Sequence, residues 1–322
     1  MTGMRALTVD PEQGLCRVTA APRPRPRRGQ ILVRISVSAV NEMDVQIRQG
    51  RWRGEVRRFR RAGPVVTGFE FAGVALSDGA RIRAGQRVIG YTHVLRGPRV
   101  HAEYACVAEN DLHAIPDGLS DEGAAALATM GLTAVEVLER IRPLTPGDRC
   151  LVIGAAGGVG AYCVQLAAAQ GAEVTAVCSA GAAEWIRALG ARTVRPYESA
   201  GRFAPGDRFD LVVDAPARSS FAEAAPHLAP GGVYVSTNPL ADLGGFARAL
   251  VSSRRAGWLM MLSTDPGRLA RLLALSESGA LSPVIDSVYE LDQANAAFDR
   301  FAARGKRGRV LLRMGPAAGG RS

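Results

Sequence analysis

The stretch CLVIGAAGGVGAYCVQLAAAQGAEVTAVCS, residues 150–179, decides the fold of this chain. It opens with the apolar run 151–153, which has the length and composition of a buried parallel strand. A glycine-rich turn follows, and apolar residues then recur at helical spacing until a second apolar run at 174–177. This order predicts a strand–turn–helix–strand unit.

Glycines in the turn allow the backbone to come close to a pyrophosphate, and the N-terminus of the following helix offers it free N–H groups. The pattern reads AxGxxG, with alanine where the dinucleotide fingerprint usually has its first glycine. We therefore predict dinucleotide binding, with a merely tight structural turn as the alternative. The predicted contacts are Ala155, Gly157, Gly158, Val159 and Gly160.

Length and composition bound the architecture. With 322 residues and 47% hydrophobic composition, the chain has enough apolar material for two domains. It has no apolar run of membrane-spanning length and no signal-peptide layout at its start, so we expect a cytoplasmic protein. The five cysteines are scattered without CxxC pairs, which favours reduced thiols.

The net charge of +10 comes almost entirely from arginine, because Lys306 is the only lysine. Surplus positive charge favours anionic partners, although a GC-rich genome would also enrich arginine. The densest stretch is 51–61, where six arginines surround Trp52 and Phe59. Arg57 and Arg58 in this stretch are predicted to grip an anionic substrate, with a solvated loop as the alternative.

The choice of cofactor depends on the end of the second strand. An acidic residue about 20 positions after the glycine turn ordinarily binds the ribose hydroxyls of NAD, whereas this strand ends VCS at Ser179. The missing carboxylate predicts NADPH, whose 2′-phosphate can accept a hydrogen bond from Ser179. Tyr197 is a further candidate, and Arg192 and Arg195 are either phosphate ligands or ordinary surface charge.

Strand and helix patterns alternate from about residue 151 to 288, which implies an α/β fold with a doubly wound parallel sheet. The residues before about 120 are rich in strands and glycine instead, and we expect them to form a separate domain.

Several segments together carry a resemblance that covers nearly the whole chain. They are ILVRISVSAVNEMDVQIRQG, GFEFAG, HAEYACV, IPDGLSDEGAAAL, GLTAVEVL, GAAGGVG, GGVYVS and GALSPVIDSVYELDQANAAFDRFAARGKRGRVLL. The sequence resembles the zinc-independent medium-chain dehydrogenase/reductases of the quinone-oxidoreductase (zeta-crystallin-like) branch. The resemblance implies a Rossmann domain at 121–284 that binds NADPH, a GroES-like catalytic domain at 1–120 completed by 285–322, and a homodimer.

The resemblance also implies chemistry without a metal. Zinc-dependent relatives have a cysteine at the position of Asn41 and a histidine at that of Phe69, and the four-cysteine structural lobe is absent. Similar proteins transfer hydride from a nicotinamide to a quinone or to a C=C bond that is activated by its own carbonyl group. Asn41 is expected to orient the reactants, with capping of the following helix as the alternative.

Further site residues follow from the same resemblance. Thr129 and Thr133 match positions that line the nicotinamide pocket, and Arg309 matches a basic residue that faces the cofactor phosphates. Asp214 is expected at the cofactor, although DAPAR at 214–218 replaces the usual glycine-rich turn there. Lys306 is expected in solvent.

On the substrate side, Trp52 stands where many relatives have a tyrosine that donates to the substrate. An indole donates a hydrogen bond but does not give up its proton, so a tyrosine-assisted mechanism is not supported. His93 and His101 are candidates for protonating an enolate, with structural roles or a proton from solvent as the alternatives.

The leading hypothesis is an NADPH-dependent, metal-free reductase of quinones or of α,β-unsaturated carbonyl compounds, such as a polyketide intermediate. A near alternative is an enoyl-thioester reductase that acts on chains bound to coenzyme A or a carrier protein. A third is a nucleic-acid-binding or scaffold protein that keeps the cofactor fold, although the dispersed basic residues argue against it.

Overall fold

The computed structural model describes residues 3–10, 15–51, 65–92, 97, 99–238, 242–257, 259 and 266–315. The chain divides into two compact units. Unit 1 comprises Met1–Thr129, Leu262–Glu277 and Pro283–Ser322, and unit 2 comprises Met130–Met261 and Ser278–Ser282. Helix α3 (Asp121–Val135) begins in unit 1 and ends in unit 2.

Unit 2 contains a six-stranded parallel sheet in the order β11-β10-β9-β12-β13-β14. Its strands are β9 (Arg149–Ile153), β10 (Glu173–Cys178), β11 (Thr193–Pro196), β12 (Phe209–Asp214), β13 (Leu228–Ser236) and β14 (Arg255–Gly257). The strand order reverses between β9 and β12, and such a switch point is where open α/β sheets bind their ligands. The doubly wound fold predicted from the sequence is confirmed.

The helices of unit 2 follow its strands. They are α4 (Gly158–Ala169), α5 (Ala183–Ala188), α6 (Tyr197–Ala200), α7 (Phe221–Ala224) and α8 (Leu243–Ala249), and a π-helical segment, Glu136–Ile141, continues α3. Helix α4 packs against β9 and β10, and α5 packs against β11. Leu151, Val177, Val212 and Tyr234 are fully buried in one core, as expected for strands that are covered on both faces.

Unit 1 is built around a seven-stranded sheet in the order β15-β16-β3-β5-β6-β8, with β7 paired to β3. Its strands are β3 (Gln30–Ala39), β5 (Glu70–Ala75), β6 (Arg87–Tyr91), β7 (Tyr104–Ala108), β8 (Leu112–Ala114), β15 (Ile285–Glu290) and β16 (Arg309–Arg313). A smaller sheet contains β2 (Leu15–Pro22), β1 (Gly3–Asp10) and β4 (Val65–Val66). Strand β16 runs antiparallel to β3, so the C-terminal part of the chain completes the N-terminal sheet.

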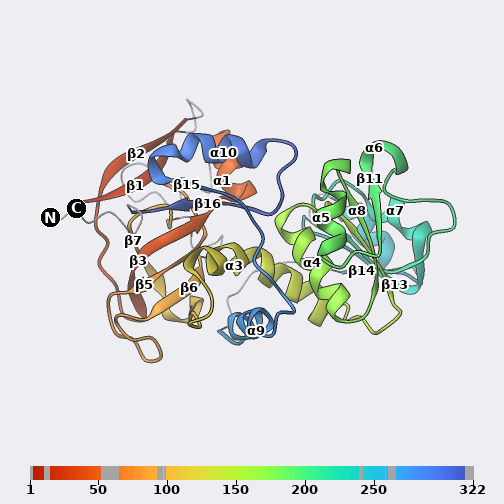
Figure 1. The fold of residues 1–322 in the computed structure, drawn as a ribbon, viewed down its shortest axis with the longest axis horizontal. Helices are drawn as coiled ribbons and strands as arrows, with labels where there is room; N and C mark the ends of the chain where they lie inside the picture. The colour runs from red at the N-terminus through yellow and green to blue at the C-terminus, as the bar shows by residue number, and fades with distance from the viewer. Residues whose placement is uncertain are drawn as a thin grey trace. The chain divides into compact units, whose positions relative to one another are not determined.

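The core of unit 1 draws on both ends of the chain. Leu7, Phe71, Phe298 and Val310 are fully buried in one cluster. The helices of this unit are α1 (Glu42–Arg48), α9 (Pro266–Glu277) and α10 (Ala294–Ala302), together with the first part of α3. Helix α10 packs against β2, β15 and β16 (Figure 1). This strand-rich unit confirms the GroES-like domain that the resemblance implied.

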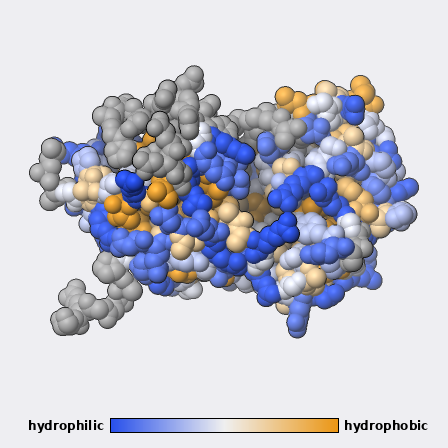
Figure 2. Space-filling model, turned by 90° about the horizontal axis from the view of Figure 1, so that it is seen from above, coloured by the Kyte–Doolittle hydropathy of each residue, from blue (hydrophilic) through white to orange (hydrophobic). Residues whose placement is uncertain are grey.

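Many arginines of the two units have carboxylate partners within their own unit. The pairs are Arg5–Asp292, Arg48–Asp299, Arg87–Asp121, Arg140–Glu136, Arg142–Asp148, Arg192–Glu173, Arg195–Asp207, Arg300–Asp286, Arg309–Glu70 and Arg313–Glu122. Part of the arginine excess is therefore used inside the fold. On the face shown in Figure 2, hydrophilic residues predominate and hydrophobic ones form small separate patches. In the part of the chain that the structure describes, no helix is long and apolar enough to cross a membrane.

Candidate active site

The glycine-rich turn lies between β9 and α4 at the switch point of the unit 2 sheet. Gly154 has a φ of +75°, a conformation that favours glycine. A Cβ atom on Gly160 would overlap the carbonyl oxygen of Gly154, so only glycine lets the helix start this close to the turn. Gly157 caps α4 without a side chain, and the first N–H groups of a helix have no partner within it.

The turn therefore fits the pyrophosphate of a dinucleotide, with N–H groups of Gly158, Val159 and Gly160 available at the helix N-terminus. Ala155 was predicted with them, but it is fully buried and its N–H donates to the carbonyl oxygen of Val177 at 3.0 Å. Its part is to hold the turn against β10 rather than to offer a donor.

Two predicted residues follow the carboxyl ends of neighbouring strands. Ser179 comes directly after β10, and Tyr197 comes directly after β11, which pairs with β10 in parallel. Burial raises the pKa of the Tyr197 phenol, while the guanidinium of Arg218 and a backbone hydrogen bond of Gly154 act in the opposite direction. Tyr197 therefore lies close both to the glycine turn and to Arg218.

The arginines near this edge have different surroundings. Arg195 forms two hydrogen bonds to the Asp207 carboxylate, at 2.5 and 2.7 Å, and Arg192 pairs with Glu173. Burial opposes the effect, but the bond from Arg195 lowers the pKa of Asp207. Arg218 is exposed after β12, and no ion pair of it is found among the described residues. Arg218 is thus the better placed of these arginines for an anionic group, and its exposure could not be read from the DAPAR segment that contains it.

Asp214 was expected at the cofactor, but its side chain turns into the core. It is fully buried, and its Oδ2 accepts hydrogen bonds from the Ser219 N–H at 2.6 Å and from the Tyr234 hydroxyl at 3.0 Å. Burial raises its pKa. These bonds hold the turn 214–219, in which the Pro216 ring lies against Gly154. Asp214 therefore shapes the cofactor side of the sheet from within and does not present its carboxylate there.

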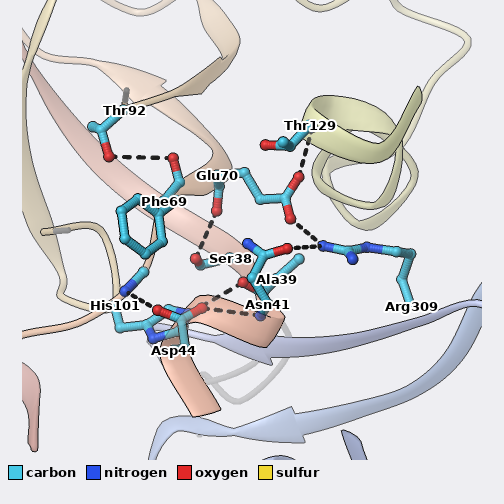
Figure 3. Close-up of polar contacts among 11 residues, drawn as sticks. Ser38, Ala39, Asn41, Asp44, Phe69, Glu70, Thr92, His101, Thr129 and Arg309 are labelled. Atoms are coloured by element: carbon cyan, nitrogen blue, oxygen red, sulfur yellow. Dashed lines mark hydrogen bonds and ion pairs between the residues drawn. The ribbon is translucent and has the colours of Figure 1, made fainter. Parts of the chain in front are cut away.

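Unit 1 holds a buried polar cluster in which β5, β16 and the N-cap of α1, all distant in sequence, each contribute a side chain (Figure 3). Arg309, at the start of β16, ion-pairs with Glu70 at the start of β5, and the same nitrogen donates to Asn41 Oδ1 at 3.2 Å. The residues Glu70, Arg309 and Asn41 are only 0, 2 and 6% exposed. Arg309 was expected to face the cofactor phosphates, but here the antiparallel pairing of β16 with β3 directs it to Asn41 and Glu70.

Both carboxylate oxygens and the main-chain carbonyl oxygen of Glu70 accept hydrogen bonds. Its Oε2 accepts the backbone N–H of Thr129 at 2.6 Å, and its main-chain carbonyl accepts the Ser38 hydroxyl at 2.6 Å. Thr129 and Thr133, the two predicted threonines, lie one turn apart on α3 and so share a side of that helix. Glu70 was present in the GFEFAG segment, but its role depends on contacts that the sequence does not display.

Asp44 and His101 are a second pair of buried titratable groups, and Asp44 holds the backbone of Asn41. Asp44 accepts the Asn41 N–H at 2.9 Å and the Gly68 N–H at 2.8 Å, and it is fully buried. Burial raises the pKa of Asp44, and the nearby His101 opposes that rise. Asn41 stands at the N-cap of α1 with Asp44 three residues later, a capping-box spacing that the sequence already contained.

His101 was a candidate for protonating the substrate. In the structure it has no exposed surface, and its ring nitrogens contact Thr67 Oγ1 at 2.9 Å and the Ala39 carbonyl oxygen at 3.3 Å. Burial lowers its pKa. These contacts correct the substrate-side assignment, because a side chain enclosed in this way supports the loop before Phe69 instead of reaching a substrate.

Four predicted substrate-side residues lie outside the described residues: Trp52, Arg57, Arg58 and His93. Lys306, expected in solvent, is half-buried with its ammonium 3.5 Å from the centre of the Phe301 ring. Burial and the neighbouring Arg309 lower the pKa of Lys306 to about 8.

The positions that hold zinc in related enzymes are Asn41 and Phe69 here. Among the described residues, no group of three or more His, Cys, Asp or Glu side chains could hold a metal ion. Phe69 is 5% exposed and its carbonyl oxygen accepts from Thr92, so this position is part of the apolar core.

Comparison with known proteins places the whole chain in one family. An alcohol dehydrogenase GroES-like domain matches residues 27–117, and a zinc-binding dehydrogenase domain matches residues 189–312. A pikromycin polyketide synthase component of Streptomyces venezuelae is 30% identical over 92% of this chain and 8% of its own length. The chloroplastic quinone-oxidoreductase homolog of Spinacia oleracea is 28% identical over 90% of this chain and 91% of its own length.

Solved structures agree with this placement. The quinone oxidoreductase of Coxiella burnetii is similar with a TM-score of 0.87 and 25% identity, and the match covers 97% of this chain and 99% of that one. The chain belongs to the medium-chain dehydrogenase/reductases, among the quinone oxidoreductase-like proteins. A mycobacterial protein solved with NADPH has a TM-score of 0.79 and 25% identity, over 96% of this chain and 99% of that one. As a member of this family, the chain is an oxidoreductase with a Rossmann-type NAD(P)-binding unit.

The glycine turn of this oxidoreductase makes a first prediction. Gly160→Ala should reduce the free energy of unfolding by roughly 1–3 kcal/mol and weaken NADP(H) binding, because the new methyl group meets the Gly154 carbonyl oxygen. The control is Gly181→Ala, whose added carbon would meet nothing within 4 Å. Chemical denaturation and calorimetric cofactor titration measure both effects, and equal behaviour of the two variants would contradict the steric account.

His101 makes a second prediction, on the pH dependence of stability. Its pKa in the folded state lies below the ordinary 6.5, so the unfolded chain takes up a proton that the folded chain does not, and stability falls as the pH drops below about 6.5. Asp44, which faces His101, has a raised pKa and therefore acts in the opposite direction at lower pH.

His101→Gln should reduce the slope of the free energy of unfolding against pH by up to about 1.4 kcal/mol per pH unit. Denaturant unfolding of native and variant protein across pH 5 to 8 is the measurement. Parallel curves for the two proteins would show that His101 is not the titrating group.

Proposed function

We propose that this oxidoreductase is an NADPH-dependent reductase that needs no metal and acts on quinones or on the activated C=C bond of α,β-unsaturated carbonyl compounds. The observation that carries the proposal is Asn41, whose carboxamide occupies the position of a zinc-ligating cysteine. Arg309 holds the carboxamide oxygen, and the Asp44 carboxylate holds the Asn41 backbone N–H. The arrangement offers a fixed hydrogen-bonding group in place of a Lewis acid.

The proposed reaction needs a cofactor site and a hydrogen-bonding group. The N–H groups at the glycine turn would hold NADPH, which would supply a hydride for the substrate. The hydride joins the β-carbon of an enone, and the C=C electron pair moves towards the carbonyl oxygen, which becomes an enolate oxygen. Asn41 stabilises this oxygen by hydrogen bonding, and solvent supplies the proton to the α-carbon because His101 is enclosed.

A metal-free mechanism is supported by the chemistry of the two replaced ligands. Zinc sites in proteins are built from thiolate, imidazole and carboxylate groups, and neither the Asn41 carboxamide nor the Phe69 ring belongs to this set. The family model that matches residues 189–312 is described as a zinc-binding dehydrogenase, but these two positions lie outside the matched range. The substrate must then carry its own polarising carbonyl group.

NADPH is supported by the edge formed by β10, β11 and β12. No carboxylate follows β10, where Ser179 stands, and Tyr197 and the exposed Arg218 lie near one another beside the glycine turn. A guanidinium and two hydroxyl groups suit a 2′-phosphate, whereas an acid directly after β10 would bind the ribose hydroxyls of NAD instead. The similar mycobacterial structure with bound NADPH agrees with this choice.

A second candidate substrate class is an enoyl thioester carried by coenzyme A or a carrier protein. The observation that favours it is the 30% identity to a polyketide synthase component, which extends over 92% of this chain. A thioester carbonyl polarises its neighbouring C=C bond in the same way as a ketone, so Asn41 would serve both substrate classes.

The deciding experiment is to follow NADPH consumption with a panel of acceptors: benzoquinone, methyl vinyl ketone, crotonyl-coenzyme A and crotonic acid. We expect turnover with the quinone, the enone or the thioester, slower turnover with NADH, and no change after treatment with a chelator. Loss of activity with the chelator and its recovery with zinc would exclude the metal-free mechanism. Failure with every acceptor, together with tight salt-sensitive binding of single-stranded RNA, would favour the nucleic-acid alternative.

Cofactor choice makes a separate prediction. Arg218→Ala should raise the KM for NADPH about 10-fold or more, because one charge-assisted hydrogen bond to the 2′-phosphate is lost, and should leave the KM for NADH unchanged. Arg192→Ala is the matched control, since Arg192 already pairs with Glu173. Steady-state kinetics with both cofactors measure the effect, and an equal rise for NADPH and NADH would remove Arg218 from the phosphate site.

A further inference from the structure

The hydrogen bond between Arg309 and Asn41 fixes the orientation of the Asn41 carboxamide as well as its position. A guanidinium has only hydrogen-bond donors, so the atom of the Asn41 carboxamide that faces it must be the oxygen. The NH₂ group of the same carboxamide then lies on the opposite side, as Figure 3 shows.

We infer that Arg309 and Glu70 are positioning residues that turn Asn41 into a dedicated hydrogen-bond donor, with its NH₂ group directed at an oxyanion of the substrate. The inference rests on the proposed reductase function and adds to it which end of the carboxamide acts and what holds it there. An amide in the reverse orientation would present a partially negative oxygen to the developing enolate and would repel it.

Glu70 keeps Arg309 in this orientation. The ion pair lies in a buried site, and the second carboxylate oxygen of Glu70 is held by the Thr129 N–H at 2.6 Å. The guanidinium is therefore anchored on one side by a carboxylate that cannot itself turn. Asp44 fixes the Asn41 backbone independently through the 2.9 Å bond to its N–H, so backbone and side chain are held by different partners.

The buried ion pair of Arg309 and Glu70 is not expected to increase the free energy of unfolding by much. Removing two charges from water opposes folding, and apolar residues of similar volume often serve as well. In addition, Arg309 Nε is buried with no hydrogen-bond partner in the described part of the chain. An arrangement that costs stability and leaves a donor unused is what a positioning role predicts.

The cation also changes the donor strength of the amide. A positive charge bonded to the carboxamide oxygen draws electron density from the C–N group, and hydrogen bonds in such a chain strengthen one another at low dielectric. The Asn41 NH₂ group should therefore bind an enolate oxygen better than a free amide does. This hydrogen bond strengthens as negative charge develops on the substrate oxygen. It therefore stabilises the transition state more than the bound substrate, and its loss should lower kcat.

The first test uses the isosteric change Asn41→Asp, which keeps an acceptor for Arg309 but removes both N–H donors. With methyl vinyl ketone as acceptor, kcat should fall about 100-fold while the KM for NADPH changes little. Asn41→Asp with unchanged kcat would overturn the donor role.

The second test asks whether Arg309 acts through Asn41. The double variant Glu70→Gln/Arg309→Met leaves no unpaired buried charge and keeps an acceptor for the Thr129 N–H. Its kcat should fall about 10-fold or more, and it should have no further effect in an Asn41→Ala background. A full effect in that background would mean a merely structural role. The matched control is Arg313→Met, which removes another β16 arginine, one that pairs with Glu122 and Glu290.

The third test needs neither cofactor nor turnover. The chain has four asparagines, so selective ¹⁵N-asparagine labelling gives four side-chain NH₂ groups, and Asn41→Asp identifies the Asn41 pair by its loss. Its resonances should shift in Glu70→Gln/Arg309→Met and stay in place in Arg313→Met. Unmoved resonances in the double variant would refute the contact. If the native protein reduced no acceptor, the proposed function would fail while this spectrum still decided the amide orientation.

Discussion

The ion pair between Arg309 and Glu70 is the interaction on which the polar interior of unit 1 depends. Each charged group that is enclosed in protein loses about several kcal/mol of hydration free energy. This loss is offset only where the ion pair has good geometry and the remaining polar atoms are hydrogen-bonded. Here Glu70 is also bonded to the Thr129 N–H, and Arg309 is also bonded to Asn41. The pair thereby joins β5, β16 and α3 to the end of β3, and it gives one carboxamide a single orientation.

Unit 2 obeys a different constraint, which is steric and local. Gly160 must lack a Cβ atom because the Gly154 carbonyl oxygen lies against it, and the ring of Pro216 covers Gly154 from the neighbouring strand end. The fully buried Asp214 holds that second turn by accepting from Ser219 and Tyr234. The cofactor edge is therefore shaped by backbone contact and one internal carboxylate, and its exposed positions are left for the nucleotide.

Local patterns explain what could be read from the sequence. The glycine turn, the strands around it and the Asn41–Asp44 capping spacing are properties of adjacent residues, and the structure contains each of them. The contacts of Arg309 with Asn41 and Glu70 could not be read in this way, because its direction depends on which strand β16 joins. His101 was misplaced because nothing next to it in sequence indicates that Thr67 and the Ala39 carbonyl enclose it.

The sequence by itself determined that a dinucleotide fold is present, that no acid follows β10, and that an asparagine replaces a metal ligand at position 41. Only the tertiary structure decided that the Asn41 oxygen faces Arg309, and that Arg195 is already engaged while Arg218 stands exposed at the strand ends. The physical reason is the same in each case. A residue's type states what it can donate or accept, but strand pairing and burial choose the partner that receives it.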